Sequence, residues 1–303
     1  YIIGRKIGYG GFSVIKEVTT MGENHEQVVC AVKIVRKQIK GKSDADNERV
    51  QTDFEREVDV WRYLKHRYIL PLIAVYDTPF ATFCITKLNS GGTLFDLIRT
   101  RRKESSSIAE AGLPVALARR YIYQLGSAIR YLHEDVRAVH RDIKPENCLL
   151  DMSAPNASIE GGNVLLCDFG MADFIHNEHR QTSDAHANIG PSQTSTNIQG
   201  SLEYTAPELI SQSSPVYSAA ADIWAYGCVM YTLLTGRMPF THEFQPRLVL
   251  MIETGAYDRE ALQTCPAVSE SDASAIDLVE RCLTLHPDDR ASIAEVLQHP
   301  WLR

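Results

Sequence analysis

The sequence lacks an excess of positive charge. Its 31 Lys and Arg residues are outnumbered by 38 Asp and Glu residues, and its formal net charge is −7 at pH 7. Proteins that bind nucleic acid usually carry a basic face, and acidic lipid surfaces also attract positive charge. The charge balance therefore disfavours both nucleic acid and an anionic membrane as partners.

Long apolar runs and paired cysteines are also missing. The densest apolar run, IWAYGCVMYTLL at 223–234, is too short to span a bilayer, and no signal-peptide pattern opens the chain. The seven cysteines are an odd number, scattered without a Cys-x-x-Cys pair. We therefore expect buried free thiols, no zinc site, and a reducing location in the cytoplasm or nucleus.

What the chain does have is a globular composition whose pattern changes near residue 88. With 303 residues, 44% of them apolar, it is long enough for one large domain or two lobes. Strand-like runs dominate before that point, apart from a helical stripe from about Thr52, and helical stripes dominate after it. The pattern predicts a small strand-rich lobe at 1–88 and a larger helical lobe at 89–303. Because Tyr1 already lies in a strand pattern, we expect a domain excised from a longer protein.

Two features of the first lobe suggest phosphate chemistry, each with a structural alternative. In IGYGGFSVI, Gly8 and Gly10 would let backbone amides approach phosphate oxygens, although a hairpin with a glycine-rich turn has the same pattern. A strand rather than a helix follows, which disfavours a dinucleotide-binding fold. Lys33 ends the strand CAVK and Glu57 lies on the next helix. They would form either a buried ion pair aimed at phosphates or an ordinary surface pair.

A short loop in the second lobe contains the residues that phosphoryl transfer requires. HRDIKPEN combines a candidate base, Asp142, with a cation, Lys144, and an amide, Asn147. A carboxylate can deprotonate an acceptor hydroxyl, a cation offsets the charge of the moving phosphoryl group, and an amide oxygen binds a metal ion. CDFG then adds a second carboxylate, Asp168, of the kind that Mg²⁺ prefers.

In this order along the whole chain, from IGYGGF at residue 7 to HPDDR at 286–290, the motifs resemble those of the eukaryotic protein kinase family. HRDxKPEN with a later DFG is highly specific, and GSLEYTAPE and ADIWAYG belong to the same pattern. Lys-Pro after HRD and Ser201 before the APE motif look like a serine/threonine kinase. GGTLFDLI and the terminal HPWL are similar to the calmodulin-dependent kinase group.

The resemblance implies an α+β, bilobal kinase fold, with a single kinase domain over 1–303. A small antiparallel sheet with one main helix would be joined near 87–91 to a mainly helical lobe, and 168–208 would be the activation segment. ATP and Mg²⁺ would be the cofactors, and proteins with Ser or Thr acceptors the substrates. The implied residues are Asp142 as catalytic base, Lys144 as the γ-phosphate cation, Asn147 and Asp168 as Mg²⁺ ligands, and Ile7, Gly8, Gly10, Phe12, Ile15, Ala31, Lys33, Glu57, the gatekeeper Thr86, Lys87 and Asn89 around the nucleotide.

The resemblance also implies structural partners, and the sequence departs from the family pattern at several positions. Glu208 should pair with Arg290, and Asp222 should brace the catalytic loop. Ser13 replaces the usual third glycine of the first motif, and Thr93 stands where several basophilic kinases carry an acidic residue. A preference for basic substrates is therefore only weakly supported.

Two polar stretches lie beside the candidate site. We interpret 151–163 as the tip of a hairpin between Asp142 and Asp168, a tolerated insertion that points away from ATP. The stretch 176–199 is either a disordered insert or a regulatory loop whose phosphate would neutralise Arg141. An upstream kinase or autophosphorylation would then modify one of Thr182, Ser183, Ser192, Thr194, Ser195 and Thr196.

Two other functional classes compete with an active protein kinase. A pseudokinase would keep the fold as a binding module, but such proteins usually lack the strand lysine, the base or the metal aspartate. Lys33, Asp142, Asn147 and Asp168 are all present. A small-molecule kinase of related fold is disfavoured by the APE and DIWAYG segments. The sequence therefore favours catalysis on protein substrates and leaves the oligomeric state open.

Overall fold

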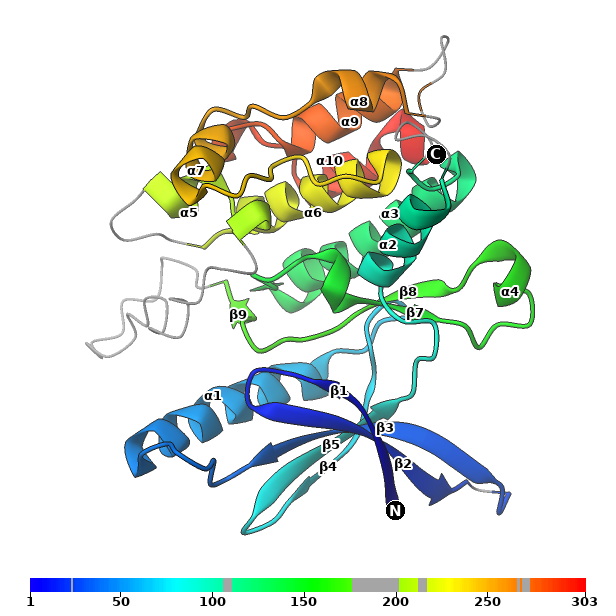
Figure 1. Cartoon of the computed structure of the whole chain (residues 1–303), viewed down its shortest axis with the longest axis vertical. Helices are drawn as coiled ribbons and strands as arrows, with labels where there is room; N and C mark the ends of the chain where they lie inside the picture. The colour runs from blue at the N-terminus through cyan, green and yellow to red at the C-terminus, as the bar shows by residue number, and fades with distance from the viewer. Residues whose placement is uncertain (23, 106–110, 176–201, 212–216, 266–267, 269–272) are drawn as a thin grey trace.

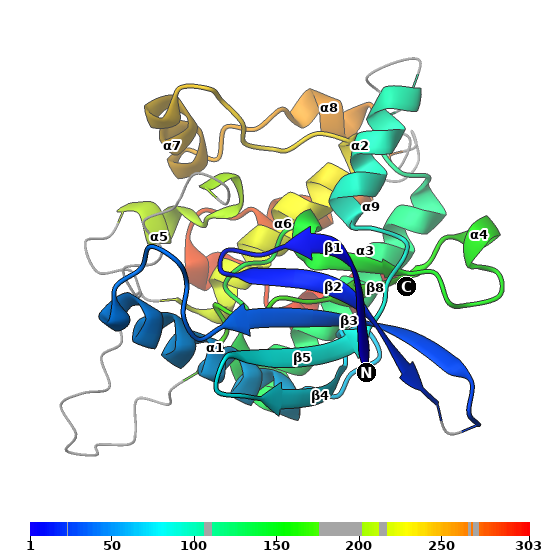
Figure 2. The ribbon, with the colours of Figure 1, turned by 60° about the horizontal axis from the view of Figure 1, so that its bottom comes forward.

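The computed structural model describes residues 1–22, 24–105, 111–175, 202–211, 217–265, 268 and 273–303. The first part of the chain forms a five-stranded antiparallel sheet with one helix beside it (Figures 1 and 2). The strand order is β1-β2-β3-β5-β4. The elements are β1 (Ile2–Tyr9), β2 (Ser13–Met21), β3 (Gln27–Arg36), α1 (Asp44–Tyr63), β4 (Leu72–Asp77) and β5 (Ala81–Lys87).

Helix α1 begins at Asp44, earlier than the apolar stripe from Thr52 predicts. Ser43 caps the helix because its hydroxyl accepts a hydrogen bond from the amide of Asp46, and the Asp46 side chain accepts one from the Ser43 amide. This reciprocal capping stabilises the first turn, although its residues carry no apolar stripe. Farther along, the apolar face of α1 packs into the same core cluster as β3 and β5.

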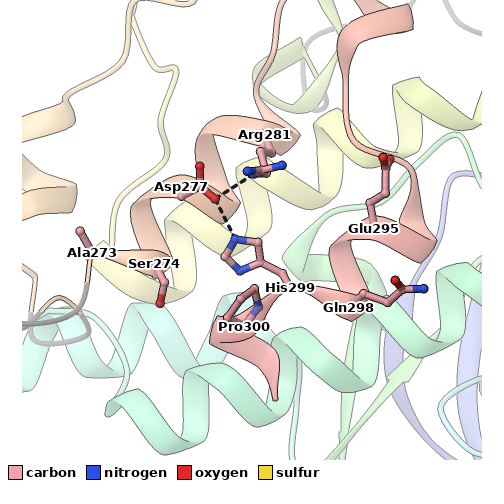
Figure 3. A pocket seen from close by; sticks show the side chains of 8 residues that line it. All are labelled: Ala273, Ser274, Asp277, Arg281, Glu295, Gln298, His299 and Pro300. Carbon is pink, nitrogen blue, oxygen red and sulfur yellow. Dashed lines mark hydrogen bonds and ion pairs between the residues drawn. The ribbon is translucent and has the colours of Figure 1, made fainter.

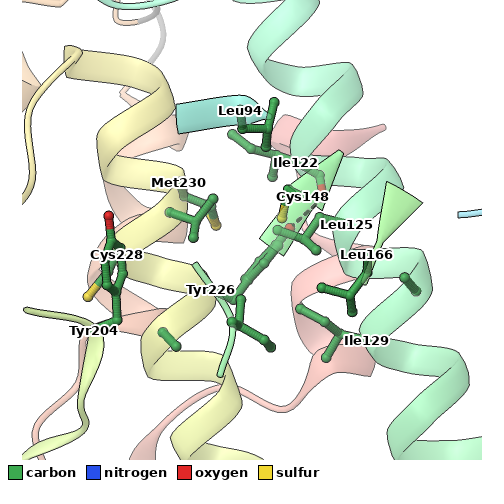
Figure 4. Packing of buried hydrophobic residues seen from close by; sticks show 14 of the residues in the cluster. Leu94, Ile122, Leu125, Ile129, Cys148, Leu166, Tyr204, Tyr226, Cys228 and Met230 are labelled. Carbon is green, nitrogen blue, oxygen red and sulfur yellow. Dashed lines mark hydrogen bonds between the residues drawn. The ribbon is translucent and has the colours of Figure 1, made fainter. Parts of the chain in front are cut away.

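Helices make up most of the second part. The central helix α6 (Ala219–Thr235) is buried along nearly its whole length and is followed by Gly236, whose φ of +72° suits a residue without a Cβ. In Figure 4 side chains of α6 meet those of α3 (Val115–Arg130), and the Tyr226 hydroxyl donates to the carbonyl of Ile122 at 2.8 Å. The helices are α2 (Leu94–Glu104), α3 (Val115–Arg130), α5 (Pro207–Ser211), α6 (Ala219–Thr235), α7 (Gln245–Glu253), α8 (Arg259–Gln263), α9 (Ser274–Cys282) and α10 (Ile293–Gln298).

Two short strand pairs lie in the helical part, near the sheet (Figure 1). β7 (Cys148–Asp151) pairs with β8 (Asn163–Leu166), so the residues on either side of the polar stretch form the predicted hairpin. Its tip contains a short helix that the sequence did not predict, α4 (Ala157–Glu160). β6 (Ala138–Val139) pairs with β9 (Asp173–Phe174) on the other side of the candidate catalytic residues.

The predicted α+β class is therefore confirmed: an antiparallel sheet with one main helix precedes a mainly helical part. All seven cysteines are free, and six of them are buried. Within the described ranges, no helix is long and apolar enough to cross a membrane.

Candidate active site

The loop that carries HRD is held in place by Asp222 of helix α6. The buried carboxylate of Asp222 accepts hydrogen bonds from the amides of His140, at 2.8 Å, and Arg141, at 2.9 Å. The His133 ring lies 2.8 Å from the same carboxylate. Burial alone would raise the pKa of Asp222, but the contacts with His133 and His140 outweigh it and lower the pKa. The predicted brace is thus present, and it holds Arg141 at a φ of +70°.

Asp142, Lys144 and Asn147 are brought together by this loop. The Lys144 ammonium lies 2.8 Å from both carboxylate oxygens of Asp142. The side-chain amide of Asn147 donates to the backbone carbonyl and to the carboxylate of Asp142, each at 2.8 Å. Because the amide nitrogen is used in this way, the amide oxygen of Asn147 faces elsewhere and is suited to a metal ion.

Asp168 lies next to this group because β7 and β8 are paired. The amide of Cys167 donates to the carbonyl of Asn147 at 2.9 Å, at the start of the hairpin. Asp168 has a φ of +64°, and its side chain is about half exposed, at 51%. The Lys33 ammonium is 4.0 Å from its carboxylate. Two carboxylates far apart in the sequence thus lie on neighbouring segments.

Lys33 and Glu57 form the predicted buried ion pair, at 2.5 Å. Burial would lower the pKa of Lys33, but Glu57 and Asp168 outweigh it and raise the pKa, so the ammonium stays charged. For Glu57, burial dominates and its pKa is raised despite the neighbouring lysine. The alternative of an ordinary surface pair is therefore wrong.

Phe169 fixes α1 against the catalytic loop. Its ring is fully buried, and the centre of the ring lies 6.1 Å from the ring centre of Trp61 on α1 and 5.2 Å from that of His140. The Trp61 indole also donates to the carbonyl of Leu70 at 2.7 Å. The helix that carries Glu57 is thus packed, through these rings, against the segments that carry DFG and HRD.

The glycine-rich stretch is a hairpin beside Lys33. Gly8 pairs with Ile15 across β1 and β2, Ile15 pairs with Lys33 across β2 and β3, and Ile7 is partly exposed. The amide of Gly10 donates to the carbonyl of Ser13 at 3.0 Å. Phe12 lies at the turn, with the Lys42 ammonium 4.4 Å from its ring centre. The turn thus lies in the same sheet as the lysine that is expected to bind phosphates.

The expected hinge follows β5 directly. Thr86 is buried and pairs with Ala31, while Lys87 is the last residue of the strand and pairs with Cys30. The side-chain amide of Asn89 donates to the carbonyl of Lys87 at 3.1 Å. The predicted nucleotide-contacting residues therefore lie on β1, β2, β3, β5 and α1, in the turn between β1 and β2, or in the segment just after β5.

The donor set fits Mg²⁺. This ion takes few ligands from protein and favours one or two carboxylate or amide oxygens, completed by water and phosphate. Asp168 and Asn147 supply two such oxygens on neighbouring segments. No group of three or more His, Cys, Asp and Glu residues in the described part of the chain could hold a metal ion by itself.

Some contacts were missed by sequence reasoning. The His133 ring, on the C-terminal extension of α3, contacts the carboxylate of Asp222. The Lys87 ammonium forms an ion pair with the carboxylate of Asp151. These partners are 89 and 64 positions apart in the sequence, so no local pattern pairs them. The predicted pair of Glu208 and Arg290 is present, with two N–O contacts of 2.8 and 2.9 Å.

A surface cavity of ≈ 600 Å³ lies away from these residues, between α9 and the end of the chain (Figure 3). Asp277 lies in its wall between two partners, the His299 ring and the Arg281 guanidinium, each at 2.8 Å.

The predicted acceptors Thr182, Ser183, Ser192, Thr194, Ser195 and Thr196 lie outside the described residues.

The fold and this arrangement agree with a match of residues 1–302 to the model of the protein kinase domain. The chain belongs to the protein kinase family. Among its relatives, it is 31% identical over 99% of its length to the SNF1-related protein kinase catalytic subunit alpha KIN12 of Arabidopsis thaliana. It is 30% identical over its full length to the serine/threonine-protein kinase srk1 of Schizosaccharomyces pombe, and 32% identical over its full length to DCLK1 of Rattus norvegicus.

These relatives confirm the serine/threonine type and the similarity to the calmodulin-dependent kinase group. The matched region covers 51% of the KIN12 chain, 51% of srk1 and 60% of rat DCLK1. The chain thus spans about half the length of the curated relatives it matches.

Proposed function

We propose that this domain transfers the γ-phosphate of Mg-ATP to serine and threonine hydroxyls of protein substrates. One observation supports the proposal above all. The cluster of Asp142, Lys144 and Asn147 is joined, by the hydrogen bond from the Cys167 amide to the Asn147 carbonyl, to the segment that carries Asp168. Asp168 in turn lies 4.0 Å from the Lys33 ammonium, which is ion-paired with Glu57. A base, two cations and two metal-ligating oxygens thus meet on one surface, as phosphoryl transfer requires.

The residues of this surface have separate roles. Asp142 orients the substrate hydroxyl and accepts its proton, and Lys144 offsets the charge of the transferred phosphoryl group. Lys33, held in place by Glu57, binds the α- and β-phosphates. Asn147 and Asp168 would hold Mg²⁺, which when bound neutralises charge on the phosphates. The glycine-rich turn covers the nucleotide, and backbone groups of 87–89 bind adenine.

Regulation by phosphorylation of 176–199 is part of the proposal. Arg141 supports it because its mostly buried guanidinium lies beside the base, 3.4 Å from Asp173 and 4.0 Å from the centre of the Tyr217 ring. A phosphate there would gain a charge-assisted contact and order the segment. An upstream kinase or autophosphorylation would supply it. A cytoplasmic or nuclear location stays a prediction.

A phosphotransfer assay tests the proposed reaction. With Mg-ATP and a peptide library, the domain should phosphorylate Ser and Thr peptides, and removal of Mg²⁺ by a chelator should stop the reaction. Asp142→Asn should lower kcat by about 10²- to 10⁴-fold, because the variant loses its general base. Lys33→Met should lower activity strongly by releasing the phosphates. Circular dichroism and thermal unfolding would show that both variants remain folded.

Asp77→Asn is a matched control. It removes a carboxylate of the sheet that forms an ion pair with Lys37 at the surface. This variant should keep its activity. Unchanged turnover in Asp142→Asn would contradict the mechanism. Nucleotide binding by the wild-type domain without any phosphotransfer, after activation of the loop, would favour the pseudokinase alternative.

A further inference from the structure

The polar insert 151–163 has a root and a tip that lie in different surroundings. Its tip, with α4, projects from the body of the molecule in Figure 1, as expected for a surface insertion. Its root contacts the expected hinge. The Lys87 ammonium lies 2.7 Å from the carboxylate of Asp151 and 2.8 Å from the hydroxyl of Ser153. We call these three residues the hinge strap.

The carboxylate of the hinge strap is held ready for the lysine. The amide of Ser153 donates to the second oxygen of Asp151 at 3.0 Å, which fixes the carboxylate in one orientation. Burial would raise the pKa of Asp151, but the hydrogen bonds from Lys87 and Ser153 outweigh it and lower the pKa. The Asp151 side chain is only 16% exposed, against 38% for Lys87. The pair is therefore less screened by water than most surface pairs.

The backbone around the hinge strap is also closely packed. The amide of Leu150 donates to the carbonyl of Gly92 at 2.9 Å. A Cβ at Gly91 would lie 2.5 Å from the carbonyl oxygen of Leu150, so this position accepts only glycine without movement of the backbone. The segment after the hinge thus lies directly on β7, and the contact of Lys87 with Asp151 extends an existing interface.

The far end of the insert is anchored on α3. The Arg120 guanidinium donates to the carbonyls of Glu160, Gly161 and Gly162, at 2.7, 2.9 and 2.9 Å. The side chain of Gln124 donates to Asn163 at 2.7 Å. These bonds fix the insert to a long helix of the second part of the chain. Because Asp151 pairs with Asn163 across the hairpin, the Lys87 side chain binds to a residue that is itself held in place by α3.

We propose that the hinge strap is a positioning device for nucleotide binding: the insert fixes the orientation of the backbone at Lys87 and limits rotation of the sheet about the hinge. The inference rests on the proposed function, in which this backbone binds adenine. Lys87, the last residue of β5, acts here through its side chain. Asp151 and Ser153 act from the helical part. A preorganised hinge binds nucleotide more tightly, since less freedom is lost on binding.

Calorimetric titration of the whole chain with Mg-ADP tests the proposal without relying on turnover. Lys87→Met and Asp151→Asn should each raise the dissociation constant about two- to fivefold, the range for loss of one partly exposed ion pair. The KM for ATP should rise by the same factor while the KM for the peptide is unchanged. Lys87→Arg, which retains the charge, should bind like the wild type.

Lys37→Met provides the matched control, since Lys37, the residue after β3, forms an ion pair of 2.8 Å with Asp77 at the end of β4 and, among the described residues, makes no bridge to the helical part. It should leave the affinity for Mg-ADP unchanged. The two levels of the inference fail separately. A folded wild-type chain that does not bind Mg-ADP overturns the proposed function. If the wild type binds and both Lys87→Met and Asp151→Asn bind equally well, the hinge strap has no positioning role.

Discussion

Arg290 joins distant segments of the helical part through one side chain. Its guanidinium donates to both carboxylate oxygens of Glu208 and to the carbonyls of Ala220, Thr284 and Leu285. The arginine side chain is fully buried, and that of Glu208 is 9% exposed. A fork of five N–H donors can satisfy these acceptors together, whereas a lysine ammonium cannot.

Arg290→Ala should therefore destabilise the fold by about 3–5 kcal/mol, because Glu208 would keep its buried charge without a partner. Arg290→Lys should lose much of the same free energy. Arg281→Ala is the control: its ion pair with Asp277 is exposed, so about 1 kcal/mol or less should be lost. Unfolding in urea measures all three, and equal losses for Arg281→Ala and Arg290→Ala would contradict the argument.

Individual site residues were predictable where the motif is contiguous. Asp142, Lys144 and Asn147 lie within six positions of each other in one loop, and the structure brings them within hydrogen-bonding distance. Lys87 and Asp151 gave no such signal. The chemistry of a lysine side chain at the end of a strand does not say which distant carboxylate it will meet, because the tertiary fold decides that pairing.

Among the elements, the change of pattern near residue 88 predicted the division into a strand-rich and a helical part. The hairpin of β7 and β8 was expected from the motifs on either side of the polar stretch, at the position observed. The start of α1 and the short helix α4 were not. Helix α1 opens with polar residues that carry a capping signal but no apolar stripe, and α4 is too short to show a period. The carbonyls of the last residue of α4 and of the residue after it accept hydrogen bonds from Arg120, which is a tertiary contact.

The true start of α1 can be distinguished by substitution. Ser43→Ala should lower stability by about 1 kcal/mol, because the cap hydroxyl is lost. Thr52→Ala, in the exposed interior of the helix, should be neutral or slightly stabilising, since alanine is the better helix former. If the helix began near Thr52, the order would be reversed. Thermal unfolding, with hydrogen exchange of the amides at 44–47, separates the two outcomes.

For the whole molecule, the acidic balance has a consequence for stability in acid. Contacts lower the pKa of several carboxyl groups below the ordinary value, among them Asp77, Asp151, Asp222 and Asp277. A lowered folded-state pKa gives stability that is fully present above the unfolded pKa, about 3.9 for Asp, and is lost as pH falls through the folded value. Glu57, whose pKa is raised, acts in the opposite direction.

The free energy of unfolding should therefore fall as the pH is lowered below about 4, where the aspartates become protonated. Asp222→Asn should be less stable at neutral pH and should show a shallower fall in acid, because one titrating group has been removed. Urea unfolding at pH values from 3 to 7 measures both effects. A fall of equal steepness in the variant would show that Asp222 does not contribute to the dependence.

The position of Trp61 also gives the molecule an intrinsic fluorescent probe. The chain has three tryptophans, and Trp224 and Trp301 both belong to the helical part. Trp61 alone lies on α1, with its indole bonded to Leu70 and packed against Phe169. Indole emission depends on polarity and on neighbouring rings. A displacement of α1 or of Phe169 would therefore change the colour and intensity of the emitted light, and the coupling of the two parts of the chain can be followed without an attached dye.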